Sequence, residues 1–129
     1  IILKQDIPFS YRHTNINGII YEITFDIHLG YDKQQQLLFN QMRDNQPSLP
    51  SAGSCFKNPK DTHSAGYLIE KVGLKGFHIG GMAFSSEHAN FLVNYDNGTY
   101  DEAIKLINLA KSKVKDKFNI DLELEIIII

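Results

Sequence analysis

The chain has 129 residues, of which 43% are hydrophobic, and this is enough for one domain or slightly more with a real core. Its formal net charge of −2 gives no electrostatic reason to expect binding to nucleic acid or to a membrane surface. A single cysteine excludes an internal disulfide, and no apolar run reaches the roughly 18 residues of a transmembrane helix.

Residues 18–29 (GIIYEITFDIHL) alternate between apolar and polar side chains, and this pattern predicts a half-buried strand. The Asn17-Gly18 pair before it is typical of a hairpin turn, so we expect the partner strand within residues 1–12. Residues 31–44 have the composition of a helix. The first residues have no cap or turn, and we expect that they continue an earlier segment of a protein.

Residues 45–54 (NQPSLPSAGS) are rich in proline, serine and glycine, and this composition predicts a loop. Proline and the residue before it are poorly suited to continue a helix, so the preceding helix should end here. We therefore place a domain boundary in this segment, with residues 1–46 on one side and residues 47–129 on the other.

After this loop the pattern predicts a short helix, two short strands, a long helix and a final strand, at residues 65–73, 76–85, 90–95, 99–119 and 120–129. Gly73 stands at the C-cap position of the short helix. Thr99 and Glu102 are spaced as a capping box at the start of the long helix, and Asn119 is suited to end it in a left-handed turn. Together these elements predict an α+β fold.

Ser54, in the sequence PSAGSCFKNP (residues 50–59), is the first candidate for chemistry. The G-x-S-x-G pattern of a hydrolase nucleophile is absent around it, and the alternative is a serine that bonds its own loop. Cys55 has no CxxC partner and no metal ligand at a suitable spacing, which favours a small packing residue over a reactive thiol. The five histidines lack metal-ligand spacing, so we predict no metal site.

Two charged residues are candidates for binding an anion or moving a proton. Arg12 follows a predicted strand in PFSYRHT, and its guanidinium suits a carboxylate or phosphate, although a surface arginine is the alternative. Alternation in the last predicted strand places Glu123 and Glu125 on one face, which is either solvated or partly covered. Ile127 continues that face, so Glu125 should lie where burial begins to affect its hydrogen bonding.

Several longer motifs occur in a specific order: FSYRHT, PSAGSCFKNP, AGYLIEKVGLKG, IGGMAFSSEHANFLVN, a capped helix and LELEI. From residue 7 onward this order resembles the C-terminal part of the UDP-N-acetylenolpyruvoylglucosamine reductases, flavoenzymes of peptidoglycan synthesis, in the subtype without a tyrosine loop. The resemblance implies that residues 1–46 end the second FAD-binding domain, as strands plus a helix. It implies that residues 47–129 form a small α+β substrate-binding domain.

The resemblance also implies a reaction and a set of site residues. NADPH reduces FAD, and the flavin delivers hydride to C3 of the enolpyruvyl ether of UDP-N-acetylglucosamine, giving UDP-N-acetylmuramate. Ser54 then acts as the general acid that protonates C2, and Arg12 and Glu125 bracket the carboxylate. An unactivated hydroxyl is a poor acid, and Lys57 is the candidate for lowering the proton affinity of Ser54 electrostatically. The remaining roles implied are substrate binding by Lys57, Asn58 and His88, and cofactor binding by Arg12 and Gly53.

Most FAD contacts in this family come from an earlier part of the protein, so we expect the isolated chain to bind FAD weakly and to be inactive. One cysteine fits a reducing compartment, so we expect a cytoplasmic enzyme. We also expect it to be monomeric. Two alternatives to a reductase are a non-catalytic UDP-sugar-binding module on the same scaffold and a plain α+β interaction domain. The presence of Arg12, Ser54 and Glu125 favours the reductase over the UDP-sugar-binding module.

Overall fold

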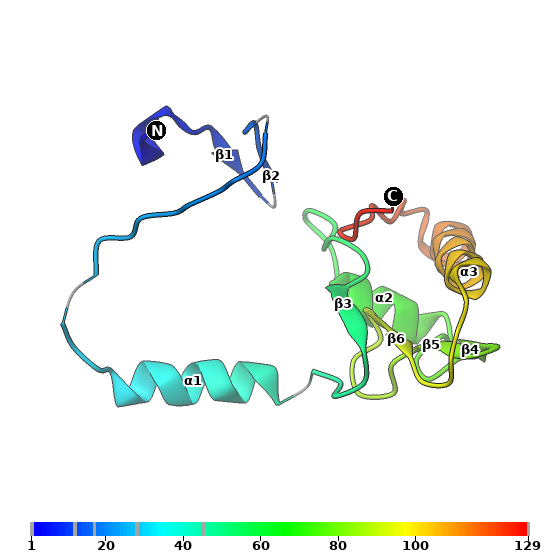
Figure 1. Ribbon diagram of the computed structural model, residues 1–129. Coiled ribbons are helices and arrows are strands. Elements are labelled where there is room, and N and C mark those ends of the chain that lie inside the picture. The colour runs from blue at the N-terminus through cyan, green and yellow to red at the C-terminus, as the bar shows by residue number, and fades with distance from the viewer. Residues whose placement is uncertain (1, 12, 17, 28, 45, 129) are drawn as a thin grey trace.

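The structure, a computed structural model, describes residues 2–11, 13–16, 18–27, 29–44 and 46–128. In chain order, the N-terminal third contains η1 (Lys4–Asp6), β1 (Phe9–Ser10), β2 (His13–Thr14) and α1 (Lys33–Arg43). The remaining elements are β3 (Ser51–Ser54), α2 (Ala65–Lys71), β4 (His78–Ile79), β5 (Met82–Phe84), β6 (Phe91–Asn94) and α3 (Tyr100–Phe118). Those from β3 onward gather into one compact unit (Figure 1), and the predicted α+β class is confirmed.

The compact unit is built on a four-stranded antiparallel sheet with the order β3-β6-β5-β4. Helix α3 packs against β4 and β5 and also contacts α2. The core between these elements contains side chains with no exposed surface, among them Phe56, Phe84, Leu68, Leu106 and Val114. Phe56 and Phe84 are the largest of them. Phe56 therefore anchors its segment, which includes the neighbouring Cys55, in the core.

The two helices of the compact unit begin and end as their sequences predict. In α2, Gly73 has φ +75° and its N–H donates to the carbonyl of Glu70, while the N–H of Leu74 donates to the carbonyl of Ile69. This pair of bonds is a Schellman motif. In α3, Thr99 and Glu102 form the predicted capping box, and Asn119 ends the helix with φ 56°.

The capping box of α3 also holds the turn between β4 and β5. Glu102 Oε2 accepts hydrogen bonds from the backbone N–H of Thr99 at 2.9 Å and of Gly81 at 3.2 Å. A Cβ atom at Gly81 would lie 2.0 Å from the carbonyl oxygen of Asp96, and one at Gly80 would collide with the Glu102 carboxylate. Only glycine therefore fits both positions of this turn.

Glu102 makes the stability of the fold depend on pH in the acid range. The N–H groups of Thr99 and Gly81 bond its ionised form and hold its pKa below the ordinary value of 4.5. This contribution is present above about pH 4.5 and is lost as the pH falls through the lower, folded-state pKa. The difference in thermal unfolding temperature between the wild type and Glu102→Gln should therefore shrink in that range. Glu87→Gln, in an exposed turn, controls for the lost charge, and a difference that does not vary with pH would contradict the expectation.

Two segments of the compact unit differ from their sequence predictions. Residues 51–54 were expected to be part of a loop, but they form β3 and pair with β6. The backbone of Gly53, at φ +86°, accompanies a register irregularity in that pairing, so the turn-forming composition marks a bulge within a strand. Residues 76–85, predicted as one strand, form the β4–β5 hairpin because Gly80, at φ +55°, turns the chain.

The predicted strand at residues 18–29 is wrong in the part that the structure describes. Residues 18–27 and 29 have no regular secondary structure, and Ile19 and Tyr21 are more than nine-tenths exposed. Among the described residues of the expected partner segment, residues 1–12, only β1 forms a strand, and it pairs with β2 through Phe9 and Thr14. An alternating sequence forms a strand only when another strand supplies its hydrogen bonds, and no described residue does so here.

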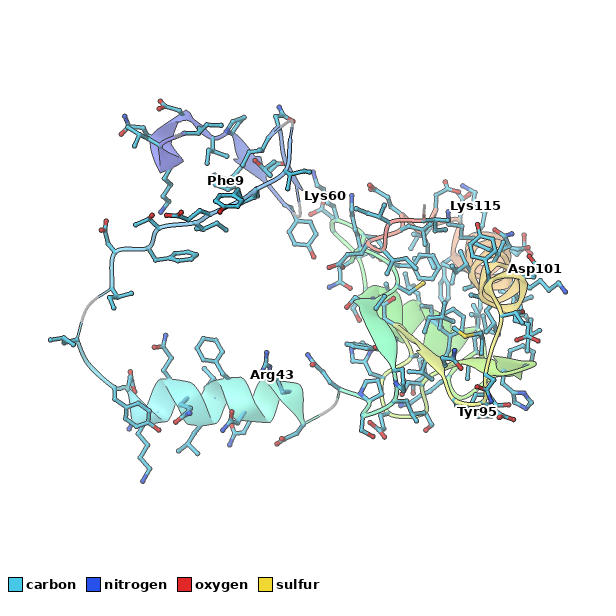
Figure 2. The ribbon with its side chains drawn as sticks, in the orientation of Figure 1. Phe9, Arg43, Lys60, Tyr95, Asp101 and Lys115 are labelled. Atoms are coloured by element: carbon cyan, nitrogen blue, oxygen red, sulfur yellow. The ribbon has the colours of Figure 1, made fainter. Side chains whose placement is uncertain are left out.

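The predicted final strand, residues 120–129, is reduced to one isolated bridge between Leu124 and Phe56 among the described residues. Helix α1 occurs close to its predicted range of 31–44 and is capped by Asp32. Its apolar side chains Leu37, Leu38 and Phe39 are each more than half exposed. Figure 2 shows α1 apart from the compact unit, with its side chains, Arg43 among them, projecting from both sides of the helix.

Candidate functional site

The candidate site is built around residues 54–58, called the Ser54 loop below. Ser54 is the last residue of β3, lies opposite Phe91 of β6 and is half-buried. The residue before it, Gly53, has a positive φ and no atom within 4 Å of the position that a Cβ would take. The position that a Gly53 side chain would take is therefore open, and the positive φ favours glycine there.

One side of the Ser54 loop is held by Asn90, which lies just before β6. The carbonyl of Asn90 accepts a hydrogen bond from the N–H of Cys55 at 2.7 Å. Its side chain makes two more bonds to Phe56: Oδ1 accepts from the N–H at 3.0 Å, and Nδ2 donates to the carbonyl at 2.8 Å. Asn90 is only 3% exposed, so these bonds are shielded from water.

The other side of the Ser54 loop is held by residues 123–125. The N–H of Glu125 donates to the carbonyl of Cys55 at 2.9 Å, and the N–H of Lys57 donates to the carbonyl of Glu123 at 2.8 Å. Glu125 is half-buried. The structure thus brings the segment of Ser54 beside the segment of Glu125, although the two residues are far apart in the sequence.

Lys57 forms an ion pair with Glu123. Its Nζ donates to Glu123 Oε1, and this hydrogen bond, together with the positive charge, lowers the pKa of the Glu123 carboxyl. Lys57 is the more shielded partner, with 27% of its side chain exposed against 73% for Glu123. The described partner of the ammonium group is therefore Glu123, and a role of Lys57 in lowering the proton affinity of Ser54 stays a prediction.

The structure gives Asn58 and His88 local partners. Asn58 Oδ1 accepts a hydrogen bond from the N–H of Ala65 at 3.0 Å, so its carboxamide ties the Ser54 loop to the start of α2. His88 Nδ1 accepts from the N–H of Asn90 at 3.2 Å. The His88 ring lies against Gly66, where an added Cβ would approach it to 3.0 Å. His88 therefore belongs to the same network as Asn90, and the predicted substrate contacts of Asn58 and His88 stay predictions.

Two further sequence candidates have different outcomes. Arg12, predicted to bind both the substrate carboxylate and the cofactor, lies outside the described residues. Cys55 is completely buried, and this burial raises the pKa of its thiol to about 12. A thiol with that pKa stays protonated at neutral pH and is a poor nucleophile, so the interpretation of Cys55 as a packing residue is confirmed.

Asn90 belongs to the candidate site, although no motif in the sequence singles it out. It stands in the run Ala89-Asn90-Phe91-Leu92-Val93, and the remaining side chains of this run are all apolar and buried. A polar residue inside such a run has to be hydrogen-bonded when the run is buried. This was the available signal, but the sequence offers no indication of which backbone groups Asn90 would bond.

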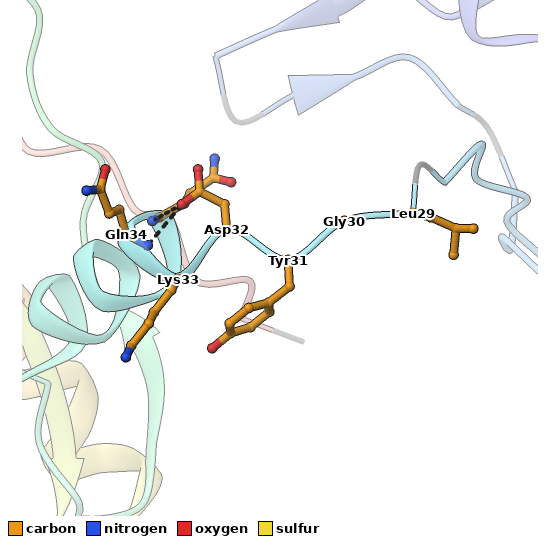
Figure 3. Close-up of a pocket in the computed structure, with 7 residues that line it drawn as sticks. Leu29, Gly30, Tyr31, Asp32, Lys33 and Gln34 are labelled. Atoms are coloured by element: carbon orange, nitrogen blue, oxygen red, sulfur yellow. Dashed lines mark hydrogen bonds between the residues drawn. The ribbon is translucent and has the colours of Figure 1, made fainter.

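The structure has a surface hollow at the start of α1, away from the Ser54 loop. It is lined by seven consecutive residues, 29–35, and Asp32 in it accepts hydrogen bonds from the N–H groups of Gln34 and Gln35 (Figure 3). A lining drawn from one short segment is the ordinary shape of a capped helix end. In the described part of the chain, no group of His, Cys, Asp and Glu side chains is arranged to hold a metal ion. None of the described helices is both long and apolar enough to cross a bilayer.

Comparison with known proteins gives consistent matches. The family model "UDP-N-acetylenolpyruvoylglucosamine reductase, C-terminal domain" matches residues 45–129. The UDP-N-acetylenolpyruvoylglucosamine reductase of Helicobacter hepaticus is 46% identical over 95% of this chain and 46% of its own length. That of Campylobacter jejuni strain RM1221 is 45% identical over 99% of this chain and 49% of its own. The chain thus spans about half the length of the curated relatives it matches.

A solved structure is also similar. The crystal structure of UDP-N-acetylenolpyruvylglucosamine reductase from Thermus caldophilus matches with a TM-score of 0.60 and 36% sequence identity. The match covers 71% of this chain and 32% of that one.

Proposed function

We propose a function for this chain as part of a longer enzyme, on the premise that the chain belongs to the UDP-N-acetylenolpyruvoylglucosamine reductase family. It is the C-terminal half of an enzyme that reduces UDP-N-acetylglucosamine enolpyruvate to UDP-N-acetylmuramate, a peptidoglycan precursor. Residues 47–129 form the substrate domain, and residues 1–46 complete a flavin-binding domain. The enzyme is cytoplasmic and acts as a monomer.

The observation that carries this proposal is the backbone link between Cys55 and Glu125. It holds the segments of Ser54 and Glu125 side by side, and both residues are half-buried, which supports assigning them to one site. Ser54 is the general acid that delivers a proton to C2 of the substrate. Glu125 hydrogen-bonds the substrate carboxylate, and Arg12 stabilises the negative charge that develops on it. Asn58, His88 and Lys57 line the substrate site.

FAD, reduced by NADPH, supplies the hydride that adds to C3 of the substrate. The chain offers an open backbone position for part of this cofactor at Gly53, where the space for a Cβ is empty to 4 Å. Arg12 is the second residue proposed to contact it. Most of the flavin contacts come from the other half of the enzyme.

The test of this function uses a full-length reductase made by joining this chain to the N-terminal half of the Campylobacter jejuni relative. We expect NADPH oxidation that depends on UDP-N-acetylglucosamine enolpyruvate and yields UDP-N-acetylmuramate, because both halves of the enzyme are then present. The measurement is NADPH absorbance together with mass analysis of the product.

The control is the 129-residue chain alone, which should neither retain FAD nor turn over. Stoichiometric FAD on that chain would contradict the proposal that the other half holds the cofactor. Binding of the substrate by the full-length protein without any reduction would contradict the reductase and favour a non-catalytic UDP-sugar-binding module.

A further inference from the structure

We propose that Asn90 is a positioning residue that sets the place of Ser54 for proton transfer to the substrate. The inference rests on the proposed function, because it assumes that Ser54 is the proton donor. It assigns a role to a residue that does not itself contact the substrate. Asn90 acts through the backbone of the two residues that follow Ser54.

Among the described residues, Asn90 supplies three of the five hydrogen bonds that hold the backbone of residues 55–57. The other two come from residues 123–125. Phe56, which receives both side-chain bonds, is completely buried. The buried ring and the bidentate carboxamide hold the backbone that directly follows Ser54, and this sets the place from which the Ser54 side chain projects.

The bonding pattern requires a carboxamide. At Asn90, one atom must accept from the N–H of Phe56 and the other must donate to its carbonyl. An ionised aspartate of the same shape only accepts, so one of its oxygens would face the Phe56 carbonyl without a proton between them. A protonated aspartate again has one donor and one acceptor. Asn90→Asp is therefore a substitution whose effect should depend on pH.

The direction of this dependence follows from the surroundings of Asn90. Burial disfavours the charged form of an aspartate at this position, and the Phe56 carbonyl favours a protonated carboxyl that can donate to it, so both raise its pKa. The N–H of Phe56 acts in the opposite direction, and the titratable group described beside Asn90 is His88, whose Nδ1 accepts from the N–H of Asn90. We expect the two effects that raise the pKa to outweigh the single N–H. The neutral, correctly bonding form should dominate at the acid end of the enzyme's working range. The ionised form should gain weight as the pH rises.

The chain contains a matched control in Asn94, at the end of the same strand, β6. Asn94 Oδ1 accepts from the N–H of Gly98 at 2.9 Å, and its Nδ2 donates to the Gly98 carbonyl at 3.4 Å. This is the same bidentate pattern on one residue's backbone, but it holds the turn before α3. Asn94→Asp therefore introduces the same chemical change without touching the Ser54 loop.

The experiment measures two single-turnover rates in the full-length reductase, each as the ratio of variant to wild type. At about pH 8, Asn90→Asp should slow the oxidation of the reduced flavin by substrate by roughly 100-fold, which is the loss typical of a misplaced catalytic group. The reduction of the flavin by NADPH should stay nearly unchanged. Most of the loss should disappear near pH 6. Asn94→Asp should leave both rates close to wild type at both pH values, while lowering the thermal unfolding temperature as Asn90→Asp does.

Three outcomes would overturn the inference. They are a wild-type substrate rate in Asn90→Asp, equal losses in Asn90→Asp and Asn94→Asp, and a loss that does not vary with pH. If Asn90→Asp does not fold, Asn90→Ser replaces it in the experiment. The serine hydroxyl can bond one group of Phe56, so oxidation of the reduced flavin by substrate should be slowed at both pH values. A wild-type rate in Asn90→Ser would again overturn the role. A wild-type enzyme that never reduces the substrate would instead overturn the proposed function itself.

Discussion

Replacing Ser54 by alanine in the full-length reductase should slow oxidation of the reduced flavin by substrate about 10²- to 10⁴-fold, the range that a positioned general acid contributes. The substrate carbon that accepts the proton would lose its donor, and water reaches a half-buried position only poorly. Reduction of the flavin by NADPH should stay nearly unchanged, because it needs no proton from Ser54. Rapid-mixing measurements of the two half-reactions separate these effects.

Ser51→Ala is the matched control for this substitution. Ser51 lies in the same strand, β3, but is exposed, and its hydroxyl accepts a hydrogen bond from the N–H of Gly53 at 3.3 Å. Its loss removes the same chemical group from the strand without removing the proposed proton donor. Normal oxidation of the reduced flavin by substrate in Ser54→Ala would exclude Ser54 as the general acid.

Replacing Phe56 by alanine should lower the free energy of unfolding of the 129-residue chain by about 3–5 kcal/mol, the usual cost of deleting a fully buried aromatic ring. Phe56 has no exposed surface and lies in the core with Leu68, Leu106 and Val114. Its backbone is also the point where Asn90 bonds the Ser54 loop. Urea unfolding, followed by circular dichroism, measures the change.

Phe77→Ala provides the comparison, because the Phe77 side chain is 41% exposed. Its loss should be clearly smaller, about 1 kcal/mol, since surface substitutions seldom exceed that value. Equal losses at the two positions would mean that the core around Phe56 contributes no more than the edge of the sheet.

The parts of the fold that the sequence predicted correctly are those fixed by local interactions. Helix α3 is delimited by Thr99, Glu102 and Asn119, and each of these acts on a neighbour within four residues. Helix α2 ends at Gly73 for the same kind of reason. In such cases the residues that decide the structure are adjacent in the sequence, so the pattern can be recognised directly.

The errors concern strands, whose formation depends on distant partners. β3 was read as a loop because Pro50 and Gly53 are typical of turns, yet residues of β6 supply its hydrogen bonds. Residues 18–29 have a strong alternating pattern but find no partner strand among the described residues. Propensity indicates that a segment can be a strand, and only a partner makes it one.

For the candidate site, the sequence could name only side chains. Motifs and resemblance point to Ser54, Lys57, Asn58, His88 and Glu125, and their roles stay predictions. The hydrogen bonds that join their segments connect residues 55–57 to residue 90 and to residues 123–125, across more than thirty positions in each case. Backbone groups carry most of these bonds, and every residue type has the same backbone groups. No sequence pattern could therefore specify them.

The hydrogen bonds from residues 123–125 to the Ser54 loop also imply an order of events during synthesis. A ribosome makes Ser54 and Asn90 first, so the bonds between Asn90 and residues 55–56 can form while translation continues. The bonds at Cys55 and Lys57 have to wait until Glu125 has left the exit tunnel. The Ser54 loop is therefore held from both sides only after residues 123–125 have been made, and until then the described bonds to the backbone of residues 55–56 come from Asn90.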